Sequence, residues 1–108
     1  MRVLLDECLP RGLRRSLPGH VVRTVQQEGW AGLVNGALLV RIEGAFDAFI
    51  TMDRGLAAQN VLRGRSFGTV VLRARSNRMA DVGPLAPAAL DALRALQPGD
   101  LRVVGDAG

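Results

Sequence analysis

Short apolar runs alternate along this chain with segments of helical character, and that alternation limits the folds available to it. Runs with the length and aliphatic composition of strands occupy residues 3–5, 20–25, 48–52, 69–72 and 101–104. Helices are expected between most of these runs, at 10–17, 35–43, 56–62 and 85–96. Because such alternation is typical of βαβ units, the sequence predicts an α/β fold with a doubly wound, mostly parallel sheet of five strands flanked by helices.

The size and composition of the chain fit one compact unit. Its 108 residues are enough for one domain with a hydrophobic core and too few for two. Hydrophobic residues make up 48% of the chain and aromatic residues only 4%, so the core is expected to be aliphatic. The sequence has no internal repeat and no linker, and residues 1–108 are expected to form a single domain.

The chain lacks the sequence signals of export and membrane insertion. No apolar run approaches the roughly 18 residues that span a bilayer, and Asp6 places a carboxylate too early for a signal peptide. The single cysteine, Cys8, allows no internal disulfide and fits a reducing compartment. We therefore expect a cytoplasmic protein without membrane contact.

The basic residues of the chain favour a partner that carries phosphate. There are 14 basic and 10 acidic residues, which gives a net charge of +4, and every basic residue other than the one histidine is arginine. A guanidinium group forms paired hydrogen bonds with phosphate. A charge of this size also occurs in ordinary domains, so composition by itself is only weak support for nucleic-acid binding.

Two of the predicted strands end in an aspartate, Asp6 and Asp53. In a doubly wound sheet the first and third strands usually lie side by side at the switch point, where ligands bind. Two carboxylates placed there repel each other. A bound Mg²⁺ or Mn²⁺, with Glu7 next to Asp6, would offset that repulsion, and so would a neighbouring arginine such as Arg54. The plainer alternative is that each aspartate only caps a turn.

A basic segment follows the fourth predicted strand at the same edge of the sheet. It contains Arg73, Arg75, Ser76, Asn77 and Arg78. These side chains can grip a phosphate backbone close to a metal. The alternative is a solvated loop that balances the charge of the acidic site.

The other polar candidates are expected to be structural. Arg11, Arg14 and Arg15 on the first helix are expected to form an exposed face, and Trp30 is expected to cap the sheet edge. Carboxylates near Cys8 should raise the pKa of its thiol, which argues against a nucleophile.

Several short motifs carry a family resemblance. They are MRVLLDECLP at 1–10, GWAG at 29–32, FITMDR at 49–54, QN at 59–60, and SNR at 76–78 followed by Asp81. In this order and at this spacing they resemble the short bacterial PIN-like domain family, which is related to the PIN-domain ribonuclease toxins of toxin–antitoxin systems. The resemblance covers nearly the whole chain, and the combination is more specific than any one motif.

The resemblance implies a PIN-like sheet with an acidic cluster that binds Mg²⁺ or Mn²⁺ and cleaves RNA. Matched by position, Asp6 and Asp53 are the metal-binding and catalytic aspartates, Thr51 is a polar support, and Asp81 is a further acidic residue. The resemblance also implies a small antitoxin-like partner protein, and it is compatible with a homodimer.

The chain departs from the family pattern at one acidic position. The family helix that follows the tryptophan connection opens with Asn-Gly-Glu or Asp-Gly-Glu, whereas this chain has alanine at position 37. A methyl group does not ligate a cation, and Glu43 lies nearly two helical turns further on. Two alternatives follow: a ribonuclease with an incomplete acidic site, or a catalytically weakened module that binds RNA or a partner protein.

A phospho-receiver domain is a third interpretation of the same acidic pattern. Receivers also carry acidic residues after the first strand and an aspartate after the third. They need a lysine at the end of the fifth strand to contact the phosphoryl group, and this chain has no lysine. The interpretation is therefore disfavoured.

Overall fold

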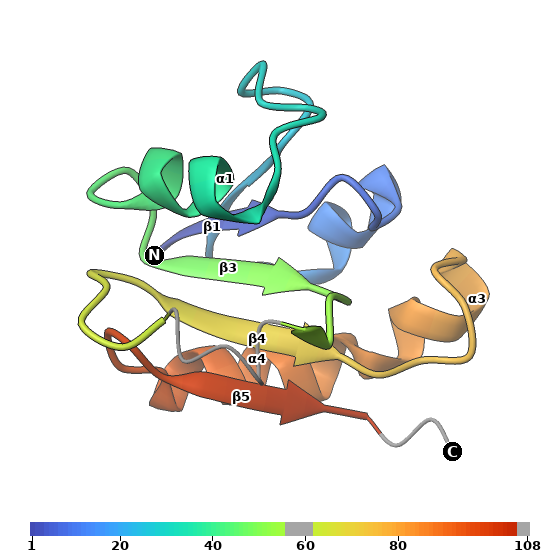
Figure 1. Cartoon of the computed structure of the whole chain (residues 1–108). Helices are drawn as coiled ribbons and strands as arrows, with labels where there is room; N and C mark the ends of the chain where they lie inside the picture. Colours follow the sequence, from blue (N-terminus) through green and yellow to red (C-terminus); the bar gives the residue numbers. More distant parts are fainter. Residues whose placement is uncertain (56–61, 106–108) are drawn as a thin grey trace.

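A parallel sheet forms the centre of the computed structural model, which describes residues 1–55 and 62–105 (Figure 1). Its five strands lie in the order β2-β1-β3-β4-β5, and every neighbouring pair is parallel. The strands are β1 (Arg2–Leu5), β2 (Val21–Thr24), β3 (Ala48–Thr51), β4 (Gly68–Leu72) and β5 (Leu101–Val104). The α/β fold with a five-stranded parallel sheet, expected from the sequence, is confirmed.

Helices cover both faces of this sheet (Figure 1). They are η1, a 3₁₀ helix (Arg11–Ser16), α1 (Asn35–Ile42), α3 (Met79–Val82), η2 (Gly83–Leu85) and α4 (Ala86–Ala95). The short α3 and η2 were not expected from the sequence, because four residues are too few for a helical period to appear. The helix expected at 56–62 lies, except for its last residue, outside the described residues. None of the described helices is long and apolar enough to cross a membrane.

The two faces of the sheet bury different kinds of side chain. Leu5, Ile50 and Leu72 belong to an aliphatic cluster with Leu13 of η1 and Leu93 of α4. The opposite cluster, under α1, contains all three phenylalanines of the chain, Phe46, Phe49 and Phe67. The expectation of an aliphatic core therefore holds for only one face of the sheet, because the few aromatic residues gather on the other face.

The register of β1 places the ends of three strands together. Leu5, the last residue of β1, lies opposite Thr24 of β2 and Ile50 of β3. The Asp6 N–H donates to the Ile50 carbonyl over 2.9 Å, which extends the pairing one residue beyond the strand. The residues that follow β1, β2 and β3 consequently leave the sheet at one edge.

Gly68, at the start of β4, is needed for close packing against the end of α4. A Cβ atom at this position would lie 2.4 Å from Cγ of Leu96 and 2.8 Å from the carbonyl oxygen of Gln97. We expect Gly68→Ala to lower the free energy of unfolding by about 1–3 kcal/mol, measured by urea denaturation, because the backbone has to move.

Gly36→Ala is the matched control. A methyl group at Gly36, in α1, meets no described atom within 4 Å. We expect this variant to leave the stability unchanged or to raise it by up to about 1 kcal/mol. Equal losses in the two variants would contradict the packing role of Gly68.

Candidate functional site

Asp6 and Asp53 line one open cleft at the carboxyl edge of the sheet. Its volume is about 350 Å³, and its remaining lining residues are Glu7, Cys8, Leu33, Leu38 and Met52. We call it the acidic cleft. The structure thus brings together the two aspartates that the strand order was expected to unite.

A buried threonine connects the two aspartates. The Thr51 hydroxyl is fully buried, donates to Oδ2 of Asp6 over 2.6 Å and accepts the Asp53 N–H over 3.0 Å. Oδ1 of Asp6 accepts the Glu7 N–H over 2.8 Å, and Oδ1 of Asp53 accepts the Gly55 N–H over 2.9 Å. These bonds orient both carboxylates, and the carboxylate oxygens keep acceptor capacity for a ligand.

Glu7 lines the same cleft and also holds the connection that follows β2. Its Oε1 accepts the Gly32 N–H over 3.2 Å, and its backbone carbonyl accepts a hydrogen bond from Nε2 of Gln26 over 3.2 Å. In that connection Trp30 packs edge-on against Phe46, with ring centroids 6.0 Å apart. This contact packs Trp30 against the phenylalanine cluster under α1, and the expected cap over the sheet edge stays a prediction.

The acidic cleft holds two aspartates and falls short of a larger metal cluster. No group of three or more His, Cys, Asp or Glu side chains within residues 1–55 and 62–105 is placed to bind a metal ion. Glu43 does not fill the gap at Ala37, because its carboxylate accepts the Ser66 N–H, and the hydrogen bonds from Ser66 hold the pKa of Glu43 below its ordinary value. The pair suits Mg²⁺, which commonly takes one or two carboxylates and keeps several waters.

Cys8 lines the cleft, and the pKa of its thiol is raised above the ordinary value. Burial is the main cause that raises the pKa of this thiol, and the charge of Asp6 raises it further. A protonated thiol is a weak nucleophile and a poor metal ligand. The carboxylates are therefore the chemically useful groups of the cleft.

The basic segment 73–78 is anchored next to the acidic cleft. Nδ2 of Asn77 donates to the carbonyl of Cys8 over 2.9 Å. Ser76 donates through its hydroxyl to Asp81 and accepts the Arg78 N–H over 3.1 Å. Ser76 and Asn77 thus position the segment, and Asp81 fixes its turn into α3.

The arginines of this region are exposed. Arg73 and Arg75 line a depression of about 290 Å³ together with Asp81. Arg54 and Arg73 line another of about 150 Å³ beside β4 and β5. Within the part of the chain that the structure describes, Arg54, Arg73, Arg75 and Arg78 form no ion pair.

No family model, no curated protein and no solved structure matches the chain.

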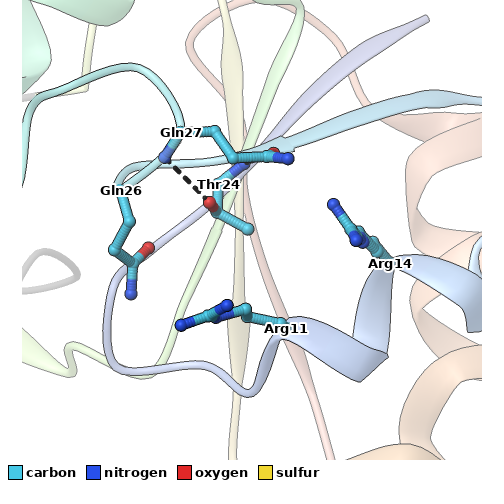
Figure 2. A pocket seen from close by; sticks show the side chains of 5 residues that line it. All are labelled: Arg11, Arg14, Thr24, Gln26 and Gln27. Atoms are coloured by element: carbon cyan, nitrogen blue, oxygen red, sulfur yellow. Dashed lines mark hydrogen bonds between the residues drawn. The ribbon is translucent and has the colours of Figure 1, made fainter.

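A pair of arginines on η1 forms a pocket that the sequence did not reveal. Arg11 and Arg14 line a depression of about 290 Å³ with Thr24, Gln26 and Gln27 (Figure 2). In a 3₁₀ helix residues three apart lie on the same side. Arg11, Arg14 and Arg15 were expected to form one exposed face, but only Arg11 and Arg14 line this pocket.

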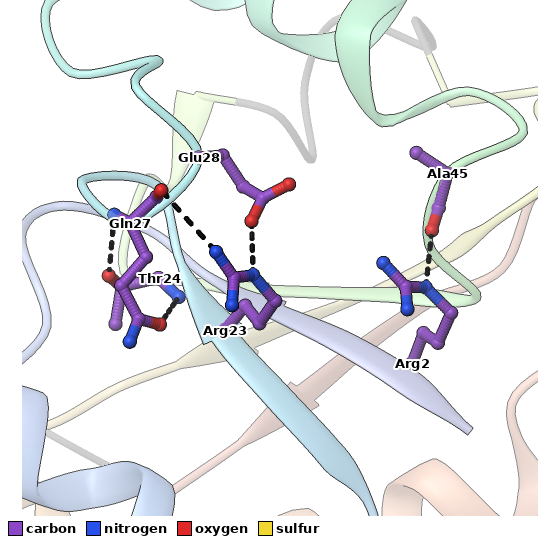
Figure 3. Close-up of polar contacts among 6 residues, drawn as sticks. All are labelled: Arg2, Arg23, Thr24, Gln27, Glu28 and Ala45. Carbon is purple, nitrogen blue, oxygen red and sulfur yellow. Dashed lines mark hydrogen bonds and ion pairs between the residues drawn. The ribbon is translucent and has the colours of Figure 1, made fainter.

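Two other arginines are used in the fold (Figure 3). Arg23 of β2 pairs with Glu28 and also donates to the carbonyl of Gln27. Arg2 of β1 donates to the carbonyl of Ala45 over 2.9 Å, with its guanidinium 5.0 Å from the centre of the Phe46 ring. These contacts separate structural arginines from those that remain open to a ligand.

The link through Thr51 predicts a specific stability change. Thr51→Val keeps the shape of the side chain and removes both hydrogen bonds of the hydroxyl. We expect a loss of about 1–3 kcal/mol in the free energy of unfolding at neutral pH, measured by urea denaturation, because Asp6 and the Asp53 N–H lose a buried partner.

Thr69→Val, in the neighbouring strand, is the control. Thr69 is fully buried as well, and its hydroxyl has no hydrogen-bond partner among the described residues. Its replacement should leave the stability unchanged or raise it slightly. If both valine variants lose the same stability, the link through Thr51 contributes nothing specific.

Proposed function

We propose that the chain is a PIN-like, metal-dependent ribonuclease, the toxin of a toxin–antitoxin pair, which hydrolyses RNA phosphodiesters in the cytoplasm. The observation that carries the proposal is that Asp6 and Asp53 line one open cleft and share the buried hydroxyl of Thr51. Two carboxylates that line one cleft repel each other, and a divalent cation bound between them would relieve that repulsion.

In this proposal each group of the cleft has a defined role. Asp6 and Asp53 would hold Mg²⁺ or Mn²⁺. The Thr51 hydroxyl positions the Asp6 carboxylate, and the Gly55 N–H positions that of Asp53. When bound, the ion supplies a water of lowered pKa and positive charge for the phosphate. Glu7, next to Asp6, adds negative charge to the cleft and ties down its rim through Gly32.

The basic segment supplies the groups that hold the substrate. Arg73, Arg75 and Arg78 are exposed, and Asn77 fixes their segment to Cys8 in the cleft. Guanidinium groups beside the cleft neutralise the charge of an RNA backbone and position it. Arg54 follows Asp53 directly and adds to the same set.

The partner in this proposal is a small antitoxin-like protein. Val34, the residue before α1, is 76% exposed. It follows Leu33, which lines the acidic cleft. A partner that contacts Val34 would therefore lie beside the cleft.

A second candidate function is a module that binds RNA or a partner protein without cleaving it. The observation that favours it is Ala37, an exposed residue of α1 where the PIN-like pattern has glutamate. A site short of one carboxylate can keep its basic surface and lose the chemistry.

The carboxylate of Asp53 is the first target for a test. We expect Asp53→Asn to lower the Mg²⁺-dependent cleavage of single-stranded RNA at least about a hundredfold. The free energy of unfolding should stay unchanged or rise, because the repulsion with Asp6 disappears.

Asp91→Asn is the control for this experiment. Asp91 is an exposed aspartate on α4 that pairs with Arg94, and its loss should leave cleavage unchanged. Equal cleavage by Asp53→Asn and the parent protein would refute the nuclease proposal.

Position 37 separates the two candidate functions. If the missing carboxylate limits the chemistry, Ala37→Glu should raise the cleavage rate at least about tenfold, because the family position regains its ligand. Ala37→Gln matches the size without the charge and should not change the rate. A glutamate variant no faster than the glutamine variant would count against a metal site that includes this position.

A further inference from the structure

We propose that the pocket between η1 and the turn after β2, here called the arginine pocket, binds a backbone phosphate of RNA. Its lining is Arg11, Arg14, Thr24, Gln26 and Gln27, with a volume of about 290 Å³. The proposal rests on the proposed function in taking RNA as the ligand, and it assigns that ligand a second contact away from the basic segment 73–78.

The charge of the arginine pocket is not balanced. The guanidinium groups of Arg11 and Arg14 extend from η1 toward the turn that carries Gln26 and Gln27 (Figure 2). Neither arginine makes a hydrogen bond or ion pair with the described part of the chain, and the pocket lining there contains no carboxylate. Two cations that share a depression without a counter-ion attract an anion, and paired guanidinium groups suit phosphate.

The turn after β2 gives the arginine pocket a rigid wall. The Thr24 N–H donates to Oε1 of Gln27 over 2.9 Å, and the Gln27 N–H donates to Oγ1 of Thr24 over 3.1 Å. This reciprocal pair occupies the amide oxygen of Gln27 and leaves its NH₂ group as a donor. Gln27 is exposed and Thr24 is buried, so the donor is held at the surface by a residue of the folded core.

The arginine pocket adjoins the acidic cleft. Gln26 lines the pocket and donates to the carbonyl of Glu7, which lines the cleft. Thr24 lies opposite Leu5 in the sheet, one residue before Asp6. The cleft therefore has anchoring arginines on two sides, in segment 73–78 and on η1, which fits an extended chain of phosphates better than a small phosphorylated molecule.

Binding of RNA in the presence of EDTA tests the proposal without cleavage. The probe is a fluorescein-labelled single-stranded RNA, followed by anisotropy at several salt concentrations. We expect Arg11→Ala/Arg14→Ala to bind about tenfold more weakly at low salt, with a salt slope about one unit smaller, because about one phosphate contact is lost.

The control Arg15→Ala/Arg41→Ala removes the same charge from exposed arginines outside the pocket. It should weaken binding less than threefold. If the two double variants weaken RNA binding equally, or if neither weakens it, the proposal is overturned. The pocket would then contribute nothing to RNA binding beyond the net charge of the protein.

Two further readouts separate the ligand and the proposed function. In the first, inorganic phosphate raises the melting temperature of the parent but not that of Arg11→Ala/Arg14→Ala, while both proteins bind RNA equally. This result would overturn RNA as the ligand and would assign a small phosphorylated molecule to the pocket. In the second, the parent shows no Mg²⁺-dependent cleavage, while Arg11→Ala/Arg14→Ala shows the expected loss of RNA binding. This result would refute the proposed nuclease activity and support phosphate binding in the arginine pocket.

Discussion

The parallel pairing of β1 with β3 sets the positions of the groups in the acidic cleft. It places Leu5 opposite Ile50 and is extended by the hydrogen bond from the Asp6 N–H to the Ile50 carbonyl. The aspartates that follow the two strands therefore leave the sheet at one edge, where Thr51 bonds to both. The contacts of Asn77 with Cys8 and of Gln26 with Glu7 then attach the basic segment and the β2 turn to this edge.

Much of the fold could be predicted, because the central strands are buried on both faces. Such strands have continuous apolar sequences, as in β3 and β4, where every residue is buried. The placement of Phe46, Phe49 and Phe67 on one face was missed, since composition does not say which side of the sheet a residue covers. The same holds for α3, which is too short for a periodic pattern and is fixed by the bond between Ser76 and Asp81.

The sequence predicted only those parts of the candidate site that strand order brings together. Asp6 and Asp53 could be brought together from strand order alone. The arginine pocket could not be predicted. It depends on η1 being a 3₁₀ helix, in which Arg15 lies on another side than Arg11 and Arg14, and on the Gln27–Thr24 pair across from them. Ser76 and Asn77 were expected to bind nucleic acid and Asp81 to be a further acidic residue; their hydrogen bonds to the protein give them a positioning role in the free chain.

Titration calorimetry with Mn²⁺ decides whether the two strand-end aspartates form a cation site. We expect the parent protein to bind Mn²⁺ at a single site and Asp6→Asn/Asp53→Asn to abolish the binding heat. Asp81→Asn should bind as the parent does, because Asp81 bonds to Ser76 and lines a different depression. Absence of Mn²⁺ binding by the parent, or unchanged binding by the double variant, would show that the two aspartates do not form a cation site.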